Sequence, residues 1–305
     1  MEEKENWRFK GNNYTYENGL DTADMETFKK DPIASLARES CQNSIDAKKE
    51  GKKKVVIEFE TFEINNRDIP GYDRLRAEIE NCKEYKNVQN NRKDYEQLSD
   101  MSKSIEKETI TCLRISDFNT TGLYGDKFYL LTKGSGITDK TGITGGSKGI
   151  GKYASFVASR FNTVFYSTYT VDGESKCLGI SKLCSAPMDG TDEKTMGTGY
   201  YGFDSKNTPM DKQLELDNNY KRTSSGTDLY ILGFRKEDSW KQQILSMLLD
   251  SFLVAVYKDE LEIRVDGINV NKANLKEIVE NENLITKNLR KSIISQYLLV
   301  SEGEG

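Results

Sequence analysis

The sequence contains no histidine and only five cysteines among 305 residues. Without histidine, the chain has no Ser–His or Cys–His nucleophile pair, no histidine general base and no histidine metal ligand. The cysteines are dispersed and never form a Cys-x-x-Cys pair. An odd, scattered set is typical of a reduced intracellular protein and argues against a disulfide framework or a zinc site. These absences exclude many common catalytic and metal-binding chemistries.

Excess positive charge and long apolar runs are also lacking. The 44 basic and 49 acidic residues give a net charge of −5, so only a local basic patch would support nucleic-acid binding. The longest apolar segment, residues 244–256, is interrupted by Asp250 and is too short to span a bilayer. The first residues contain no apolar stretch of the signal-peptide kind. We therefore expect a cytoplasmic protein that does not enter membranes.

The apolar fraction of 36% is sufficient for a core, and the length suggests one or two domains. Asp31 and Pro32 suit the start of a helix, and Gly51 suits its end. Seven of the 24 glycines fall between Gly134 and Gly151, which concentrates backbone freedom there. We expect helices over about 32–50, 150–160 and 240–257, strands over 54–64, 110–116 and 227–234, hairpins over 164–183 and 261–270, a charged helical surface insertion over 65–108, a loop over 185–224, and a helical end after about 272.

The first candidate cluster lies on the helix expected over 32–50. At about 100° per residue, Glu39, Asn43 and Asp46 fall within an arc of roughly 60°. Ile33 and Cys41 lie toward the other side, so one face packs and the other carries two carboxylates and an amide. The alternative interpretation is an ordinary solvated helix face.

The second candidate cluster follows the strand expected over 110–116. Asp117 ends this strand and is followed by small turn residues, so its carboxylate can point into a pocket and accept a hydrogen bond from an exocyclic amine. The alternative is an Asx-type turn that closes the strand. A small polar turn around Gly226 and Thr227 starts a later strand and is uninformative by itself.

The third candidate cluster is the glycine-rich segment from Gly146 to Lys152, directly before an expected helix. Glycines in this position let backbone N–H groups converge on an anion, and Lys148 and Lys152 add positive charge. The alternative is a flexible loop. The segment nearly fits a P-loop, but Tyr153 occupies the place of the magnesium-binding Ser or Thr, and no apolar strand precedes it. The glycine spacing also fails the dinucleotide-binding fingerprint.

The order of these clusters resembles the GHKL ATPases, a family that includes gyrase, MutL, the ninety-kilodalton heat-shock chaperones, MORC proteins and histidine kinases. The residues Glu39-xxx-Asn43-xx-Asp46 resemble its N box, Gly146-xx-Gly149-x-Gly151-Lys-Tyr-Ala-Ser-Phe its second glycine box, and Gly226-Thr227 its last box. The resemblance covers about residues 31–235. The first glycine box usually reads DxGxG, whereas here Asn119 stands for its first glycine and Gly122 sits one place late. Asn tolerates left-handed backbone angles, so this replacement is feasible.

The resemblance implies an α+β fold of the Bergerat type. This fold is a two-layer α/β sandwich with a mixed, mostly antiparallel sheet and helices on one face. It also implies an N-terminal arm at 1–30, an ATP-binding domain at 31–235 with an ATP lid at about 120–149, and the start of a second, transducer-like α/β domain at 236–305. Within this family, the sequence resembles the MutL/MORC-like branch most.

The resemblance also implies roles for individual residues. Asp117 would accept a hydrogen bond from the adenine amino group with support from Thr227, Asn43 would coordinate magnesium, and Glu39 would be the general base. The other residues expected to contact the nucleotide are Asp46, Asn119, Gly122, Gly146, Ser147, Lys148, Gly149, Ile150, Gly151 and Lys152.

The function implied is magnesium-dependent ATP binding and slow hydrolysis, driving lid closure and dimerisation of a conformational switch. Because a histidine kinase needs a phosphoacceptor histidine, the absence of histidine together with Glu39 favours hydrolysis. The alternatives are a nucleotide-binding regulatory module with negligible turnover and, less favoured, a P-loop-like phosphotransferase. The expected partners are ATP, a second copy of the chain joined through an exchanged segment at about 1–25, and a protein or DNA client in repair, chromatin-like compaction, chaperoning or phage defence.

Overall fold

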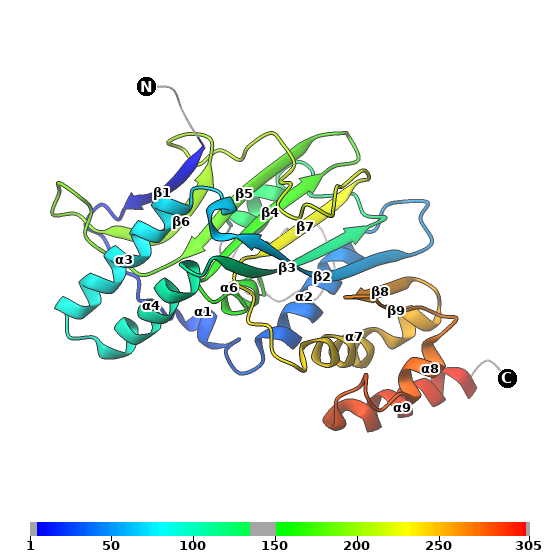
Figure 1. Cartoon of the computed structure of the whole chain (residues 1–305). Helices are drawn as coiled ribbons and strands as arrows, with labels where there is room; N and C mark the ends of the chain where they lie inside the picture. The colour runs from blue at the N-terminus through cyan, green and yellow to red at the C-terminus, as the bar shows by residue number, and fades with distance from the viewer. Residues whose placement is uncertain (1–4, 135–150, 303–305) are drawn as a thin grey trace.

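The computed structural model describes residues 5–134 and 151–302, which contain a nine-stranded mixed sheet (Figure 1). The strands lie in the order β1-β6-β5-β4-β7-β3-β2-β8-β9, and every neighbouring pair is antiparallel except β2 and β8. The strands are β1 (Asn6–Gly11), β2 (Val55–Asn65), β3 (Thr109–Phe118), β4 (Thr163–Tyr169), β5 (Ser175–Lys182), β6 (Thr195–Gly202), β7 (Gly226–Ile231), β8 (Leu261–Val265) and β9 (Ile268–Val270). The expected α+β class with a mixed, mostly antiparallel sheet is confirmed.

The helices lie at both faces of this sheet. They are α1 (Ala23–Glu26), α2 (Pro32–Asp46), the 3₁₀ turn η1 (Asn66–Asp68), α3 (Tyr72–Val88), α4 (Arg92–Ile105), α5 (Lys127–Thr132), α6 (Tyr153–Val157), α7 (Trp240–Tyr257), α8 (Leu275–Glu280) and α9 (Lys287–Glu302). Within the described ranges, no helix combines the length and apolar character that a membrane span requires.

The sheet separates two apolar cores, because successive side chains of a strand point to opposite faces. On β2, Ile57 and Phe59 pack into a core shared with α2, α6 and α7, whereas Phe62 and Ile64 pack into a core shared with α3 and α4. The expectation of helices on one face is therefore wrong. The reason lies in the 65–108 segment, where an apolar stripe that includes Leu75 is fully buried against the sheet.

Helix α2 begins as its sequence predicts and ends earlier. The Asp31 carboxylate accepts a hydrogen bond from the Ala34 amide at 3.3 Å, and Pro32 is the first helical residue. The helix stops at Asp46 and not near residue 50, because the next residues pair with the segment after β3: the Thr121 amide donates to the Ala47 carbonyl at 2.9 Å. A tertiary contact therefore sets this end.

The N-terminal segment forms part of the sheet. Strand β1 pairs with β6 of the same chain at one edge, and Trp7 is buried with its indole N–H donating to the Pro70 carbonyl at 2.8 Å. Strand β6 lies within the segment expected to be a loop, so that expectation is wrong. Its glycines obscured a strand pattern, yet Gly199 is needed there, because an added Cβ would lie 2.3 Å from the ring of Phe9.

Residues after 235 continue the same sheet and the same core. Strand β8 pairs in parallel with β2, and the buried side chains of α7, including Leu245 and Leu249, pack in the core that also contains Ile33 of α2. In the described part of the chain no second sheet forms. The C-terminal hairpin therefore extends the sheet at the edge of β2, and the domain boundary expected at residue 236 stays a prediction.

The edge position of β1 leads to a stability prediction. Trp7→Ala should lower the free energy of unfolding by about 3–5 kcal/mol, since the change removes a buried aromatic side chain and leaves a cavity. Chemical denaturation would measure it. Val88→Ala, at an exposed site on α3, is the control and should change stability by less than about 0.5 kcal/mol. An equally small effect at Trp7 would contradict the packed position of β1.

Candidate functional site

A cavity of about 90 Å³ lies between α2, the adjacent ends of β3 and β7, and the start of α6. It brings together most of the described residues that the sequence singled out. Those that line it are Glu39, Asn43, Asp117, Gly151, Lys152 and Thr227. Its walls also include the apolar side chains of Leu36, Ile115, Leu123, Leu131 and Leu229. An apolar pocket with a few convergent polar groups is the usual form of a small-molecule site.

Asp117 is held in place by three neighbours. Its Oδ1 accepts hydrogen bonds from the Thr227 amide at 2.8 Å and from the Thr120 hydroxyl at 2.5 Å. The Ser44 hydroxyl of α2 lies 3.4 Å from its Oδ2. Burial raises the pKa of Asp117, and the nearby Arg222 charge and these two Oδ1 hydrogen bonds oppose that rise. The structure therefore contains an oriented carboxylate, whose ionised form gains from each further hydrogen-bond donor.

A steric constraint explains why glycine precedes Thr227. Gly226 has a φ of +153°, and a Cβ there would lie 2.4 Å from the Asp117 carbonyl oxygen and 2.7 Å from its Oδ1. Only glycine lets the backbone approach closely enough for the Thr227 amide to reach the carboxylate. The Thr227 hydroxyl lies 3.3 Å from that of Thr168, which the sequence did not indicate.

Arg222 supports the site from behind. Its guanidinium donates to the backbone carbonyls of Asp117 at 2.9 Å and of Thr227 at 3.0 Å, and it forms a buried ion pair with Asp228 at 2.6 Å. Sequence reasoning missed Arg222, because it lies in the segment read as a loop and no local pattern marks it. Its position links the two strand ends that carry the site.

The three residues of the predicted polar face of α2 lie in different surroundings. Glu39 is half-buried and lies so close to Gly151 that a Cβ added there would be 2.0 Å from the Glu39 carboxyl carbon. Asn43 is exposed at the mouth of the cavity. Asp46 is exposed, accepts a hydrogen bond from Gln42 at 2.9 Å and does not line the cavity. The expected nucleotide contact by Asp46 is thus not supported by the geometry.

Two further expected contacts, Asn119 and Gly122, shape the loop after β3 and do not line the cavity. Asn119 has a left-handed backbone with φ of +63°, which confirms that it adopts the conformation usual for glycine. Its side-chain amide donates to the Lys54 carbonyl at 3.0 Å. Gly122 has φ of +69° and approaches the Tyr169 carbonyl so closely that a Cβ would lie 2.5 Å from it.

The glycine-rich segment is only partly described. Gly146, Ser147, Lys148, Gly149 and Ile150, together with 135–149 of the expected lid, lie outside the described residues. Helix α6 runs only from Tyr153 to Val157 and is shorter than expected. The Lys152 ammonium donates to the carbonyls of Leu131, at 3.3 Å, and Gly134, and burial lowers the pKa of Lys152.

No match to this chain is found in a scan against protein-family models, and none in a search of curated proteins. Across residues 5–134 and 151–302, no group of three or more Cys, Asp or Glu side chains is arranged to hold a metal ion. The geometry of the cavity is therefore the main indication of function.

The raised pKa of Asp117 predicts a pH-dependent stability. The folded state keeps the proton of Asp117 to higher pH than the unfolded chain does, so the wild type loses stability as pH rises from about 3.8 through the raised value. Asp117→Asn has no carboxyl group to titrate at this position. The free energy of unfolding of the variant minus that of the wild type should therefore increase between about pH 4 and pH 7. Urea unfolding across that range would measure it.

Ser44→Ala is the matched control for this prediction, because it alters a neighbour of Asp117 and keeps the carboxyl group. It should keep a loss of stability of the same sign as pH rises, because the carboxyl group still titrates. A difference between wild type and Asp117→Asn that stays constant or falls with pH would contradict the assignment.

Proposed function

We propose that the chain binds ATP with magnesium in a Bergerat-type site and hydrolyses it slowly. The observation that carries this proposal is the Asp117 carboxylate, oriented by the Thr227 amide in a cavity with apolar walls. A carboxylate so placed can accept a hydrogen bond from an exocyclic amine, and apolar walls suit a purine ring.

The dimensions of the cavity indicate how a nucleotide would divide between interior and surface. A volume of about 90 Å³ is below the 300–1,000 Å³ usual for whole ligands. We propose that the base enters the cavity and that the phosphates lie outside it, over the exposed Asn43 and beside Gly151 and Lys152. In this arrangement the Asn43 amide and the Glu39 carboxylate of α2 would lie next to the triphosphate.

The residues present suit a weakly held magnesium ion. Mg²⁺ commonly keeps several waters and is bound by one or two protein oxygens together with substrate phosphates. The Asn43 side chain would provide the protein oxygen, and the lack of a multi-carboxylate group among the described residues agrees with that sparse coordination. When bound, the ion would neutralise phosphate charge.

Glu39 would act as the general base. Its carboxylate lies at the cavity, one helical turn before Asn43. In the proposed arrangement it would therefore face the phosphates. There it would orient a water molecule and accept a proton from it at a carboxylate oxygen. The close approach of Gly151 limits the space available to this side chain.

Nucleotide-dependent dimerisation is also part of this proposal, with a protein or DNA client. Strand β1 pairs with β6 of its own chain, so exchange of an N-terminal segment would first require these strands to separate. Size-exclusion chromatography with a non-hydrolysable ATP analogue should show a larger species than the free protein. A monomer that persists with bound analogue would contradict dimerisation without contradicting nucleotide binding.

Glu39→Gln should reduce ATP hydrolysis by about 10²–10⁴-fold, because it removes the proton acceptor. Binding of Mg-ATP, measured by calorimetry, should persist. Asp46→Asn is the control on the same helix, since Asp46 is exposed outside the cavity, and it should hydrolyse ATP at the wild-type rate. Binding with no turnover in wild type and Glu39→Gln alike would support the regulatory-module alternative.

Asn43→Ala should abolish the magnesium dependence of ATP binding, because it removes the proposed protein ligand of the ion. Titration of ATP with and without magnesium would measure this. Retention of full magnesium-dependent binding by the variant would contradict the proposed site and favour the P-loop-like alternative.

A further inference from the structure

A second and larger cavity lies beside the candidate nucleotide site. Its volume is about 500 Å³, within the range usual for small-molecule sites. It is lined by residues of the sheet strands β1, β4, β5 and β6 and of the helices α1, α5 and α6, and Lys152 and Tyr166 border both cavities. Neither the sequence motifs nor the proposed function accounts for it.

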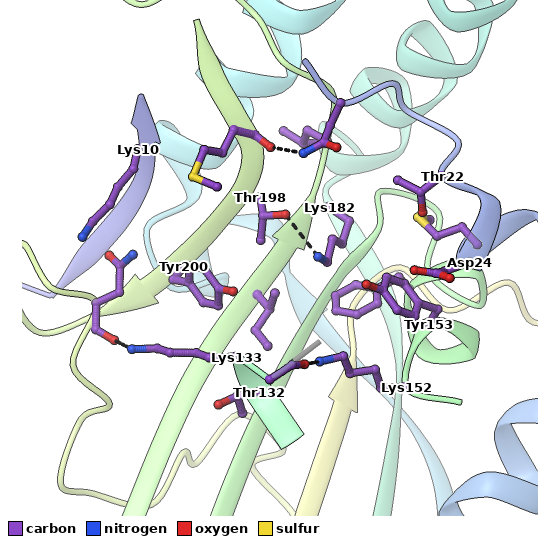
Figure 2. Close-up of a pocket in the computed structure, with 18 of the residues that line it drawn as sticks. Lys10, Thr22, Asp24, Thr132, Lys133, Lys152, Tyr153, Lys182, Thr198 and Tyr200 are labelled. Carbon is purple, nitrogen blue, oxygen red and sulfur yellow. Dashed lines mark hydrogen bonds between the residues drawn. The ribbon is translucent and has the colours of Figure 1, made fainter. Parts of the chain in front are cut away.

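Four lysines from separate segments converge on this cavity (Figure 2). Lys10 comes from β1, Lys133 follows α5, Lys152 precedes α6 and Lys182 ends β5. Asp24 is the one acidic residue among the lining residues in the described part of the chain. The cavity therefore carries a clear excess of positive charge, although the chain as a whole is acidic.

None of these lysines forms a close ion pair with a described carboxylate, and the more distant charge of Asp24 offsets only part of the effect of burial on the pKa of Lys152 and Lys182. Within the described ranges, no Asp or Glu oxygen lies within 4.0 Å of any of the four ammonium groups. They bond to neutral oxygens: Lys133 donates to the Asn207 carbonyl at 2.6 Å, and Lys182 to the Thr198 hydroxyl at 3.1 Å. A partly buried charge without a counter-ion favours the binding of an anion.

The pKa values of two of these lysines are consistent with the excess of positive charge in the cavity. Burial, with a smaller contribution from the Lys152 charge, lowers the pKa of Lys182 to about 8. Burial and the charge of Lys10 lower the pKa of Lys133. The lysines therefore disfavour one another's charged form, and an anion between them would reverse that effect.

Two unsatisfied polar atoms provide an independent observation. The hydroxyl oxygen of Thr22 and the side-chain carbonyl oxygen of Asn207 are buried without a hydrogen-bond partner in the described structure, and both residues line this cavity. Buried polar groups are nearly always paired. Both residues therefore carry an unpaired polar atom close to the wall of the cavity.

We propose that this cavity is a second ligand site, which binds a small molecule carrying two or more phosphate groups through Lys133, Lys152 and Lys182. The enclosed setting of these lysines favours a small metabolite over a polymer backbone or a membrane surface, which could not enter a cavity of about 500 Å³.

Calorimetry with inorganic tripolyphosphate as the probe tests this site. The wild type should bind it, and Lys182→Met and Lys133→Met should each weaken binding at least about tenfold, as expected for loss of a charge-assisted hydrogen bond. Lys276→Met, on the exposed face of α8, removes the same charge elsewhere and should bind as the wild type does. Equal losses in all three variants, or no binding by the wild type, would overturn the proposal.

Two further measurements separate this site from the nucleotide site and from misfolding. Asn43→Ala alters the phosphate end of the first cavity and should retain tripolyphosphate binding measured with magnesium present. Its loss would show that the probe occupies the phosphate end of the nucleotide site, which would overturn a separate site. Thermal unfolding should show that Lys182→Met is folded, because it replaces a partly buried charge by an apolar side chain of similar length.

Discussion

The candidate nucleotide site depends on the hydrogen bond from the Thr227 amide to the Asp117 carboxylate. This contact joins the ends of two adjacent strands, and it requires the absence of a side chain at Gly226. Helix α2 is placed against the same carboxylate through Ser44. A helix, two strands and a loop are thus held around one ionisable group.

The opposite face of the sheet supports this arrangement. Asp228, next to Thr227, points to that face and accepts hydrogen bonds from Ser116 at 2.6 Å and from Arg222. Arg114 continues the buried polar network through an ion pair with Asp217 at 3.2 Å. A buried charge is tolerated only when it is paired and hydrogen-bonded, so each member restricts the positions of the others. The network therefore makes the strand ends rigid where the cavity requires it.

The two cavities differ in the way their polar groups are satisfied. The smaller one holds a carboxylate that already has protein donors, within apolar walls. The larger one holds several ammonium groups whose neighbours are neutral. Lys152 borders both, and its bonds to Leu131 and Gly134 fix it between them. The charge of this one residue therefore acts on ligands of either cavity.

Local sequence determined the start of α2 at Asp31–Pro32, the hairpin turns and the whole of α7, because capping, turn chemistry and apolar periodicity act within a few residues. It also indicated Glu39, Asn43, Asp117 and Thr227. Tertiary structure alone decided the early end of α2, the pairing of the glycine-rich β6, the packing of α3 and α4 on the second face, and the position of Arg222. These features depend on contacts between segments distant along the chain, and local sequence carries no record of which distant backbone or side chain will satisfy them.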